Sequence, residues 1–268
     1  MKKILTVLLC ICLMLSVSAC GENIPKLIED GKLHVGIDPY YEPMEMKDGE
    51  TYSGIDVEII LAVAEKMGLE VVFEDLAWSA IFIALDGGQV DIICSSVSIT
   101  QARIDEKKMI FSEPYFSNGI YIVVPKGKDT IKTLEDLEGL TISVQEDTTA
   151  DIACKKQAEK TDGPKFTISS YETVQMALLA LESGQVDALV CDAPVAMGFV
   201  QKNPDKFEIS SVKLSNEPIA IALRAGNEEL QKEINEALKA LHEDGTLSKI
   251  SIKYLGEDYT KDIDPKLF

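Results

Sequence analysis

The octapeptide Ala84-Leu85-Asp86-Gly87-Gly88-Gln89-Val90-Asp91 is repeated in similar form 96 residues later, as Ala180-Leu181-Glu182-Ser183-Gly184-Gln185-Val186-Asp187. Each copy indicates the end of an amphipathic helix, then a glycine that stops the helix, and then a buried strand. The two predicted strands are residues 90–94 and 186–191. Two copies are too few for a solenoid, which needs at least three stacked repeats. The repeat therefore predicts two similar α/β lobes.

The segments around the two copies support this architecture. Residues 33–37 and 140–144 are apolar strand signals that precede the first and the second copy. Gly54 opens a helical pattern that Gly68 ends, and Asn227 is a plausible N-cap for a later amphipathic helix. Strands that alternate with helices predict a mostly parallel sheet covered by helices.

The composition limits the class of protein. Of 268 residues, 46% are hydrophobic and 26% are charged, which excludes a disordered chain. Repeated long apolar runs are absent from the sequence, which excludes a multi-span membrane protein. The net charge of -19 argues against nucleic acid as a partner, because phosphate binding needs clustered lysine and arginine.

The N-terminus has the pattern of a secreted lipoprotein. A basic Met1-Lys2-Lys3 precedes an apolar run over residues 4–19, which is short for a membrane span. Val17-Ser18-Ala19-Cys20-Gly21 then resembles the bacterial lipobox, although an ordinary cleavage beside a chance cysteine is the alternative. We expect residues 1–19 to be a signal peptide, Cys20 to carry lipid and residues 20–31 to be a tether. This predicts a protein outside the cytoplasm that is anchored to the cell membrane.

The remaining cysteines indicate neither a metal site nor a disulfide framework. Cys94, Cys154 and Cys191 are odd in number and lack the spacing of zinc ligands. We expect them to be buried as small hydrophobic side chains, and we expect no metal and no other cofactor.

Candidate binding residues follow the predicted strands, because ligands of α/β sheets bind beyond the carboxyl ends of strands. The segments are residues 38–41, 95–103, 145–149 and 192–194. Arg103 can pair with a carboxylate and Asp192 with an ammonium group, which together suit an α-amino acid. From the residues alone, a surface ion pair for Arg103 and a helix cap for Asp192 stay open.

From Lys32 to Gly256 the chain resembles the family-3 solute-binding proteins, which bind amino acids for ABC importers. The resemblance is carried by Gly54-Ile55-Asp56-Val57-Glu58, Ser96-Val97-Ser98-Ile99-Thr100 with Arg103, Phe111-Ser112-Glu113-Pro114-Tyr115, Thr148-Thr149, Asp192-Ala193-Pro194 and Leu241-His242-Glu243-Asp244-Gly245-Thr246. It implies a monomer of the periplasmic-binding-protein-like α/β fold, type II, whose two lobes are joined by a two-crossing hinge. Its partners would be an amino acid and the importer's permease.

The resemblance also implies lobe limits and roles for individual residues. Lobe 1 would comprise residues 24–115 and 219–268, and lobe 2 residues 119–215. At the ligand's α-carboxylate it implies Arg103, Ser98, Thr148 and Thr149; at the α-ammonium Asp192, Ser96 and Ser98; and at the side chain Tyr41, Trp78, Asp38 and Gln145. The chain departs from the family at Asp147, where members usually carry glycine, although aspartate tolerates a left-handed backbone better than most residues.

Two questions stay open at this point. Asp38, with Glu42 or Glu146, favours a basic amino acid, whereas Gln145 and Tyr41 suit a polar neutral one equally well. Rival functions are a carboxylic-acid dehydratase on the same fold, with Glu146 or Asp38 as general acid, and a ligand sensor for a separate membrane receptor. The combination of Arg103 and Asp192 favours binding without catalysis, so we expect no enzyme.

Overall fold

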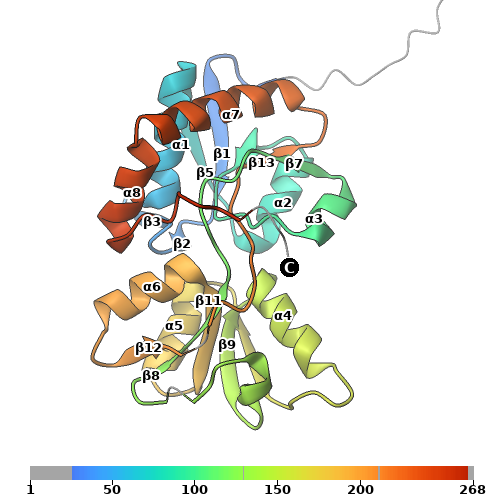
Figure 1. The fold of residues 1–268 in the computed structure, drawn as a ribbon. Coiled ribbons are helices and arrows are strands. Elements are labelled where there is room, and N and C mark those ends of the chain that lie inside the picture. The colour runs from blue at the N-terminus through green and yellow to red at the C-terminus, as the bar shows by residue number, and fades with distance from the viewer. Residues whose placement is uncertain (1–25, 129, 211, 265–268) are drawn as a thin grey trace, which may run out of the picture.

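The computed structural model describes residues 26–128, 130–210 and 212–264, and it contains two five-stranded sheets, one above the other in Figure 1. The upper sheet has the order β5 (Glu70–Asp75), β1 (Lys32–Ile37), β6 (Ile92–Ile93), β13 (Ala222–Arg224) and β7 (Met109–Phe111). The lower sheet has the order β10 (Thr167–Tyr171), β9 (Thr141–Gln145), β11 (Ala188–Asp192), β8 (Ile120–Pro125) and β12 (Phe207–Ile209). The two α/β lobes predicted from the repeat are therefore present.

Helices cover both sheets (Figure 1). The upper lobe contains α1 (Ile55–Met67), α2 (Trp78–Asp86), α3 (Gln101–Glu106), α7 (Glu228–Glu243) and α8 (Thr246–Leu255). The lower lobe contains the short 3-10 helix η1 (Leu134–Leu137), α4 (Thr149–Ala158), α5 (Val174–Glu182) and α6 (Ala193–Lys202). A small third sheet, β2 (Tyr40–Tyr41), β3 (Glu45–Asp48) and β4 (Thr51–Ser53), was not expected from the sequence.

The prediction of a mostly parallel sheet holds for only part of each lobe. β5, β1 and β6 are parallel, as are β10, β9 and β11. The last two strands of each sheet are antiparallel to their neighbours. The reason is topological, because β8 and β13 enter their sheets directly from the other lobe and no crossover helix precedes them.

The aspartate that ends each copy of the repeat has a structural role. The Asp91 carboxylate accepts a hydrogen bond from the His34 amide at 2.8 Å, and the Asp91 amide donates to the His34 carbonyl. Asp187 makes the same two bonds with Thr141, its carboxylate accepting at 3.0 Å. Each aspartate thus holds its strand beside the first strand of its lobe, which explains why the two copies are alike.

Two local predictions need correction. The strand expected over residues 90–94 is limited to Ile92–Ile93, although the flanking amides of Asp91 and Cys94 still donate to carbonyls of β1. Asn227 is the N-cap residue of α7, as predicted, but its side chain makes no capping hydrogen bond and donates to the Lys26 carbonyl instead.

Two segments carry the chain between the lobes and lie side by side. Tyr115 donates from its amide to Ile219 at 3.0 Å, Ile219 to Phe116 at 2.9 Å, and Glu217 to Asn118 at 3.1 Å. This antiparallel ribbon is what the two-crossing hinge requires, while the lobe limits given above stay a prediction.

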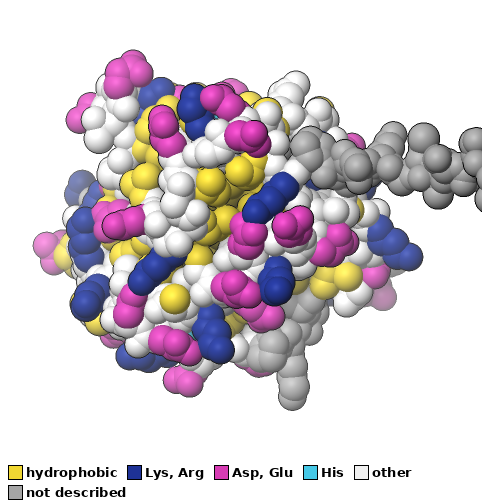
Figure 2. Space-filling model, turned by 90° about the horizontal axis from the view of Figure 1, so that it is seen from above, with side chains coloured by type: hydrophobic (Ala, Val, Ile, Leu, Met, Phe, Trp, Pro, Cys, Tyr) yellow, Lys and Arg dark blue, Asp and Glu magenta, His cyan; other side chains and the backbone are white. Residues whose placement is uncertain are grey.

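The described surface carries charges of both signs, and the three cysteines are as the sequence analysis expected. On the face drawn in Figure 2, basic side chains are scattered among acidic ones. Cys94, Cys154 and Cys191 are unpaired and buried, as expected. Within the described part of the chain, no helix has the length and apolar character of a membrane span. The predicted signal peptide and Cys20 lie outside the described residues.

Candidate functional site

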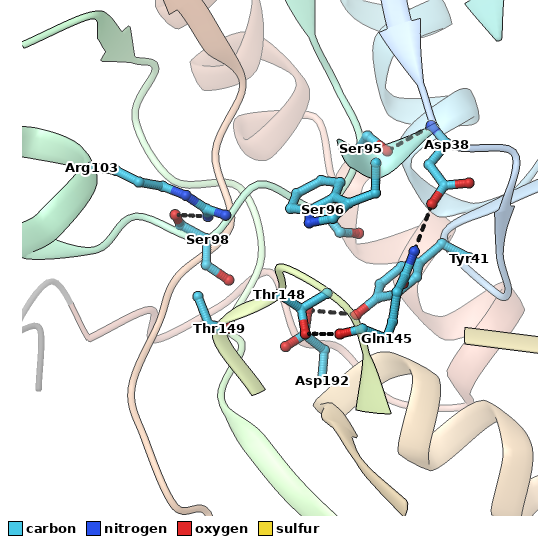
Figure 3. Close-up of a pocket in the computed structure, with 11 residues that line it drawn as sticks. Asp38, Tyr41, Ser95, Ser96, Ser98, Arg103, Gln145, Thr148, Thr149 and Asp192 are labelled. Carbon is cyan, nitrogen blue, oxygen red and sulfur yellow. Dashed lines mark hydrogen bonds between the residues drawn. The ribbon is translucent and has the colours of Figure 1, made fainter. Parts of the chain in front are cut away.

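A cavity between the lobes collects the candidate residues (Figure 3). It holds about 310 Å³ of space not filled by atoms, part of it open to solvent. The lining residues are Asp38, Tyr41, Trp78, Ser95, Ser96, Ser98, Arg103, Gln145, Thr148, Thr149 and Asp192. The structure thus brings together all ten residues proposed from the sequence and adds Ser95, and their contacts with a ligand remain a prediction.

Arg103 is held at one end of this cavity. Thr100 caps α3 and accepts the Arg103 amide at 3.2 Å, and the guanidinium donates to the Ser98 carbonyl at 2.7 Å. The guanidinium also lies over the rings of Trp78 and Phe82, 5.6 and 5.0 Å from their centroids. No carboxylate of the described residues forms an ion pair with it, so the surface ion pair considered above is wrong. The remaining N–H donors of the fork suit a carboxylate.

Asp192 contributes a buried carboxylate with a free acceptor. One oxygen accepts the Tyr41 hydroxyl at 2.8 Å, whereas Oδ1 is buried without a hydrogen-bond partner. Asp192 is the N-cap residue of α6, as the helix-cap alternative had it, but its side chain makes no capping hydrogen bond. A buried carboxylate oxygen of this kind calls for a hydrogen-bond donor, and an ammonium group would supply both a donor and a compensating charge.

Binding of an ammonium group to Asp192 should depend on pH. Burial raises the pKa of Asp192 to about 6, and the charge of Glu217 adds to the rise while Tyr41 opposes it. Only the ionised carboxylate attracts an ammonium group, so affinity should fall by up to tenfold for each pH unit below about 6. Titration of an amino acid between pH 4.5 and 8 measures this. A flat profile would show that Asp192 is ionised throughout or does not face the ligand.

The loop that ends in α4 tolerates the departure from the family at Asp147. Asp147 has φ 59°, the left-handed conformation that glycine would supply there. Its amide donates to the buried Asp151 carboxylate at 2.9 Å, and its carbonyl accepts the Trp78 indole at 3.1 Å. Thr148 caps α4 by accepting the Asp151 amide and donates to the Gln145 carbonyl. Aspartate therefore keeps the loop in shape, and the first turn of α4 lies at the cavity.

The opposite end of the cavity is acidic. Figure 3 shows Arg103 and Asp38 on opposite sides of the view. Gln145 donates to the Asp38 carboxylate at 2.9 Å and to the Glu172 carbonyl at 3.2 Å, while Gln145 Oε1 is buried without a partner. Burial raises the pKa of Asp38, Gln145 opposes the rise, and the charge of Glu172 adds to it. Asp38 and Glu172 also line a neighbouring cleft together.

The sequence analysis placed two acidic residues near the cavity that do not line it, and it missed two others. Glu42 forms an ion pair with Lys202 of the other lobe, and neither Glu42 nor Glu146 lines the cavity. Glu172 was missed although it follows the carboxyl end of β10, where the rule used for the other segments would have found it. Glu217 lies in the ribbon and has a buried oxygen without a partner, and no sequence pattern pointed to it.

Direct bonds between the lobes show a closed arrangement. The hydrogen bonds Tyr41–Asp192 and Gln145–Asp38, together with the Trp78–Asp147 bond, each join a residue of the upper lobe to one of the lower. The same residues that would touch a ligand therefore also hold the lobes together.

Comparisons with known proteins agree with this geometry. Residues 33–257 match the bacterial extracellular solute-binding proteins, family 3. The chain belongs to this family. A relative is the L-cystine-binding protein TcyJ of Escherichia coli (strain K12), 31% identical over 238 residues, which cover 88% of this chain and 87% of that one.

Solved structures of related proteins show the same fold. An ancestral arginine-binding protein bound to arginine has a TM-score of 0.77 and 37% identity, covering 84% of this chain and 99% of its own. The same kind of protein bound to glutamine has a TM-score of 0.76 and 37% identity, covering 85% of this chain and 100% of its own. The ancestral amino acid-binding protein AncCDT-1, a precursor of cyclohexadienyl dehydratase, has a TM-score of 0.75 and 35% identity, covering 84% and 96%. The predicted periplasmic-binding-protein-like fold is confirmed.

Proposed function

We propose that this family-3 protein is the substrate-binding component of an amino-acid ABC importer. One observation carries the proposal: the cavity presents Arg103, whose guanidinium forms no ion pair with a described carboxylate, and Asp192, which has a buried oxygen without a donor from the described residues. Arg103 comes from one lobe and Asp192 from the other. A zwitterion that binds both would stabilise the closed form, which is the form an importer recognises.

The preferred ligand in this proposal is a basic amino acid. Arg103 and Asp38 lie on opposite sides of the view in Figure 3. A ligand with its α-carboxylate at Arg103 would therefore extend its side chain toward Asp38. Asp38 and Glu172 would then surround a distal cation with negative charge. A polar neutral side chain is the second candidate, because Gln145 offers an unpaired carbonyl oxygen. Acidic ligands rank last, since Arg103 is the one cation among the residues that line the cavity.

Calorimetric titration against the twenty amino acids tests this proposal. Residues 21–268 would be unfolded and refolded to remove any carried-over ligand. We expect binding near micromolar, about -8 kcal/mol, to arginine or lysine. Binding of glutamine alone would support the importer function and contradict the proposed subsite for a cationic side chain. Binding of no amino acid would contradict the assignment as a whole.

Replacement of Asp38 by asparagine should change selectivity. Asp38→Asn removes the charge beside the distal end, so affinity for arginine should fall far more than affinity for glutamine. Glu42→Gln is the control for selectivity, because Glu42 is an acid of the same segment outside the cavity. Loss of its ion pair between the lobes should change the affinity for arginine and for glutamine alike. Equal losses for both ligands in Asp38→Asn would refute the cationic subsite.

The proposal includes attachment to the membrane through lipid on Cys20 and action as a monomer beside the permease. Cys20→Ser should release the protein into the soluble fraction, because acyl chains on the cysteine supply the anchor. Fractionation of cells that express both forms measures this. Continued sedimentation of Cys20→Ser with membranes would refute the lipid anchor.

The proposal also holds that the protein binds without turnover. The comparison with a precursor of a dehydratase, which shares the fold, makes turnover of the ligand the alternative to binding alone. Of the two general acids considered, Glu146 does not line the cavity and Asp38 is engaged by Gln145. Both groups that suit an amino acid, Arg103 and Asp192, are in place.

A further inference from the structure

Two buried carboxyl groups lie behind the cavity wall and take no part in the binding proposed above. Glu45 is in β3 and Asp56 in the first turn of α1, and both are 0% exposed. The Asp56 amide donates to the Met44 carbonyl at 3.0 Å, which holds the two segments together. No basic side chain of the described residues forms an ion pair with either group.

The two carboxyl groups have unequal surroundings. Asp56 accepts hydrogen bonds from the Ser96 amide at 2.6 Å, the Ser96 hydroxyl at 3.0 Å and the Tyr115 hydroxyl at 2.7 Å. Neither oxygen of Glu45 accepts a well-formed hydrogen bond from a donor of the described residues, although the Asp56 and Ser95 side chains lie close enough to shift its pKa. Donors stabilise a carboxylate, so the negative charge belongs on Asp56.

The Asp56 carboxyl group is a close neighbour of Glu45 and affects its pKa. A hydrogen bond between the two groups would need a proton, since two carboxylates are both acceptors. Burial and then the charge of Asp56 raise the pKa of Glu45 well above its ordinary value. The other ionisable groups around the pair are Asp38, Tyr41, Cys94 and Tyr115, none of which is basic. Two carboxyl groups that are buried together without a cation share one proton.

Asp56 controls the shape of the cavity wall. Ser96 has φ 49°, a left-handed conformation that is uncommon for a residue other than glycine. Both polar hydrogens of Ser96 point to Asp56, and Ser96 lines the cavity beside Ser95. The Ser95 hydroxyl in turn accepts the Asp38 amide at 3.0 Å. The carboxylate behind the wall therefore fixes the segment on which the ligand's ammonium group would rest.

The geometry points to Glu45 as a positioning residue: it stays protonated beside Asp56, so that a single carboxylate holds Ser96 in its binding conformation. The inference rests on the proposed function only where it says that Ser96 binds a ligand. Ionisation of Glu45 would place a second buried charge next to Asp56 and weaken the folded state.

The first test compares the pH dependence of unfolding. The protein, its Glu45→Gln variant and a Glu65→Gln control are unfolded in urea at pH 5.5, 6.5 and 7.5. Glu65 is exposed on α1, the helix that carries Asp56. The unfolded chain releases a proton that folded Glu45 keeps, so the wild-type folded-to-unfolded ratio should fall by up to tenfold per pH unit relative to Glu45→Gln. Glu65→Gln should follow the wild type. If the folded-to-unfolded ratio changes with pH in the same way in all three proteins, the inference is overturned.

The second test follows Ser96 directly. Its amide proton should resonate far downfield in the wild type and in Glu45→Gln, and should move upfield in Asp56→Asn. An unchanged Ser96 resonance in Asp56→Asn would overturn the positioning role, and if that variant does not fold, the milder Ser96→Ala must lower arginine affinity at least about tenfold. If the wild type binds no amino acid, the proposed function fails, while the unfolding curves and the amide signal still decide this inference.

Discussion

Replacement of Arg103 by alanine should weaken amino-acid binding by about 2–5 kcal/mol, the loss expected when one partner of a desolvated charge pair is removed. The guanidinium is the single cation of the cavity lining, and its orientation is set by the bond to the Ser98 carbonyl. Nothing else in the lining could neutralise an α-carboxylate. Calorimetric titration with arginine and with glutamine measures the loss, which should be similar for both because they share the α-carboxylate.

Arg103→Lys is the matched control for this experiment. Lysine keeps the charge but loses the planar fork, so it should recover only part of the affinity. The guanidinium also lies over Trp78 and Phe82, so urea unfolding of each variant is needed to separate binding from folding. Equal dissociation constants for the wild type and Arg103→Ala would remove Arg103 from the site.

Replacement of Gly54 by alanine should lower the free energy of unfolding by about 2–6 kcal/mol, since a forbidden φ and an overlap each cost about 1–3 kcal/mol. Gly54 has φ 128°, a value that other residues rarely adopt. A Cβ atom there would lie 2.2 Å from the Met44 carbonyl oxygen, which belongs to backbone and cannot move aside alone. The close approach of Gly54 to Met44 holds β3 against α1. The substitution should therefore also disturb the arrangement of Glu45 beside Asp56.

Gly139→Ala separates the two causes in this second prediction. Gly139 also has a positive φ, 74°, but a Cβ atom there would meet nothing within 4 Å. It should therefore cost only the strain of a left-handed alanine, about 1–2 kcal/mol. Urea unfolding of both variants gives the comparison. Equal losses would show that close approach of the backbone at Gly54 contributes nothing.

Much of the fold was predictable because it is encoded locally. The helix that ends at Gly68, the repeated glycine stops and the apolar strand signals all depend on residues within a few positions of one another. The antiparallel strands β8 and β13 were not predictable in this way, because their direction depends on which lobe the chain has just left. A strand of three to six residues carries the same pattern in either direction.

The candidate site shows the same division. The ten cavity residues were found because parallel strands deliver the residues after their carboxyl ends to one edge, and because the family resemblance assigned them roles. Glu172 could have been found by the same rule. Glu217 and the buried Glu45 could not, because an isolated glutamate in a sequence is far more often exposed than buried.

The sequence by itself determined that the chain has two similar lobes, the residues that follow their strands, and a zwitterion as the ligand that Arg103 and Asp192 suit best. Only the tertiary structure decided that Arg103 has no ion-pair partner, and an Asp192 oxygen no donor, among the described residues. It also decided that Gln145 reaches Asp38 across the lobes. Those facts depend on contacts between residues separated by as many as 151 positions, such as Tyr41 and Asp192. Periodicity and spacing describe neighbours along the chain, whereas partner and burial are set by the packing of distant segments.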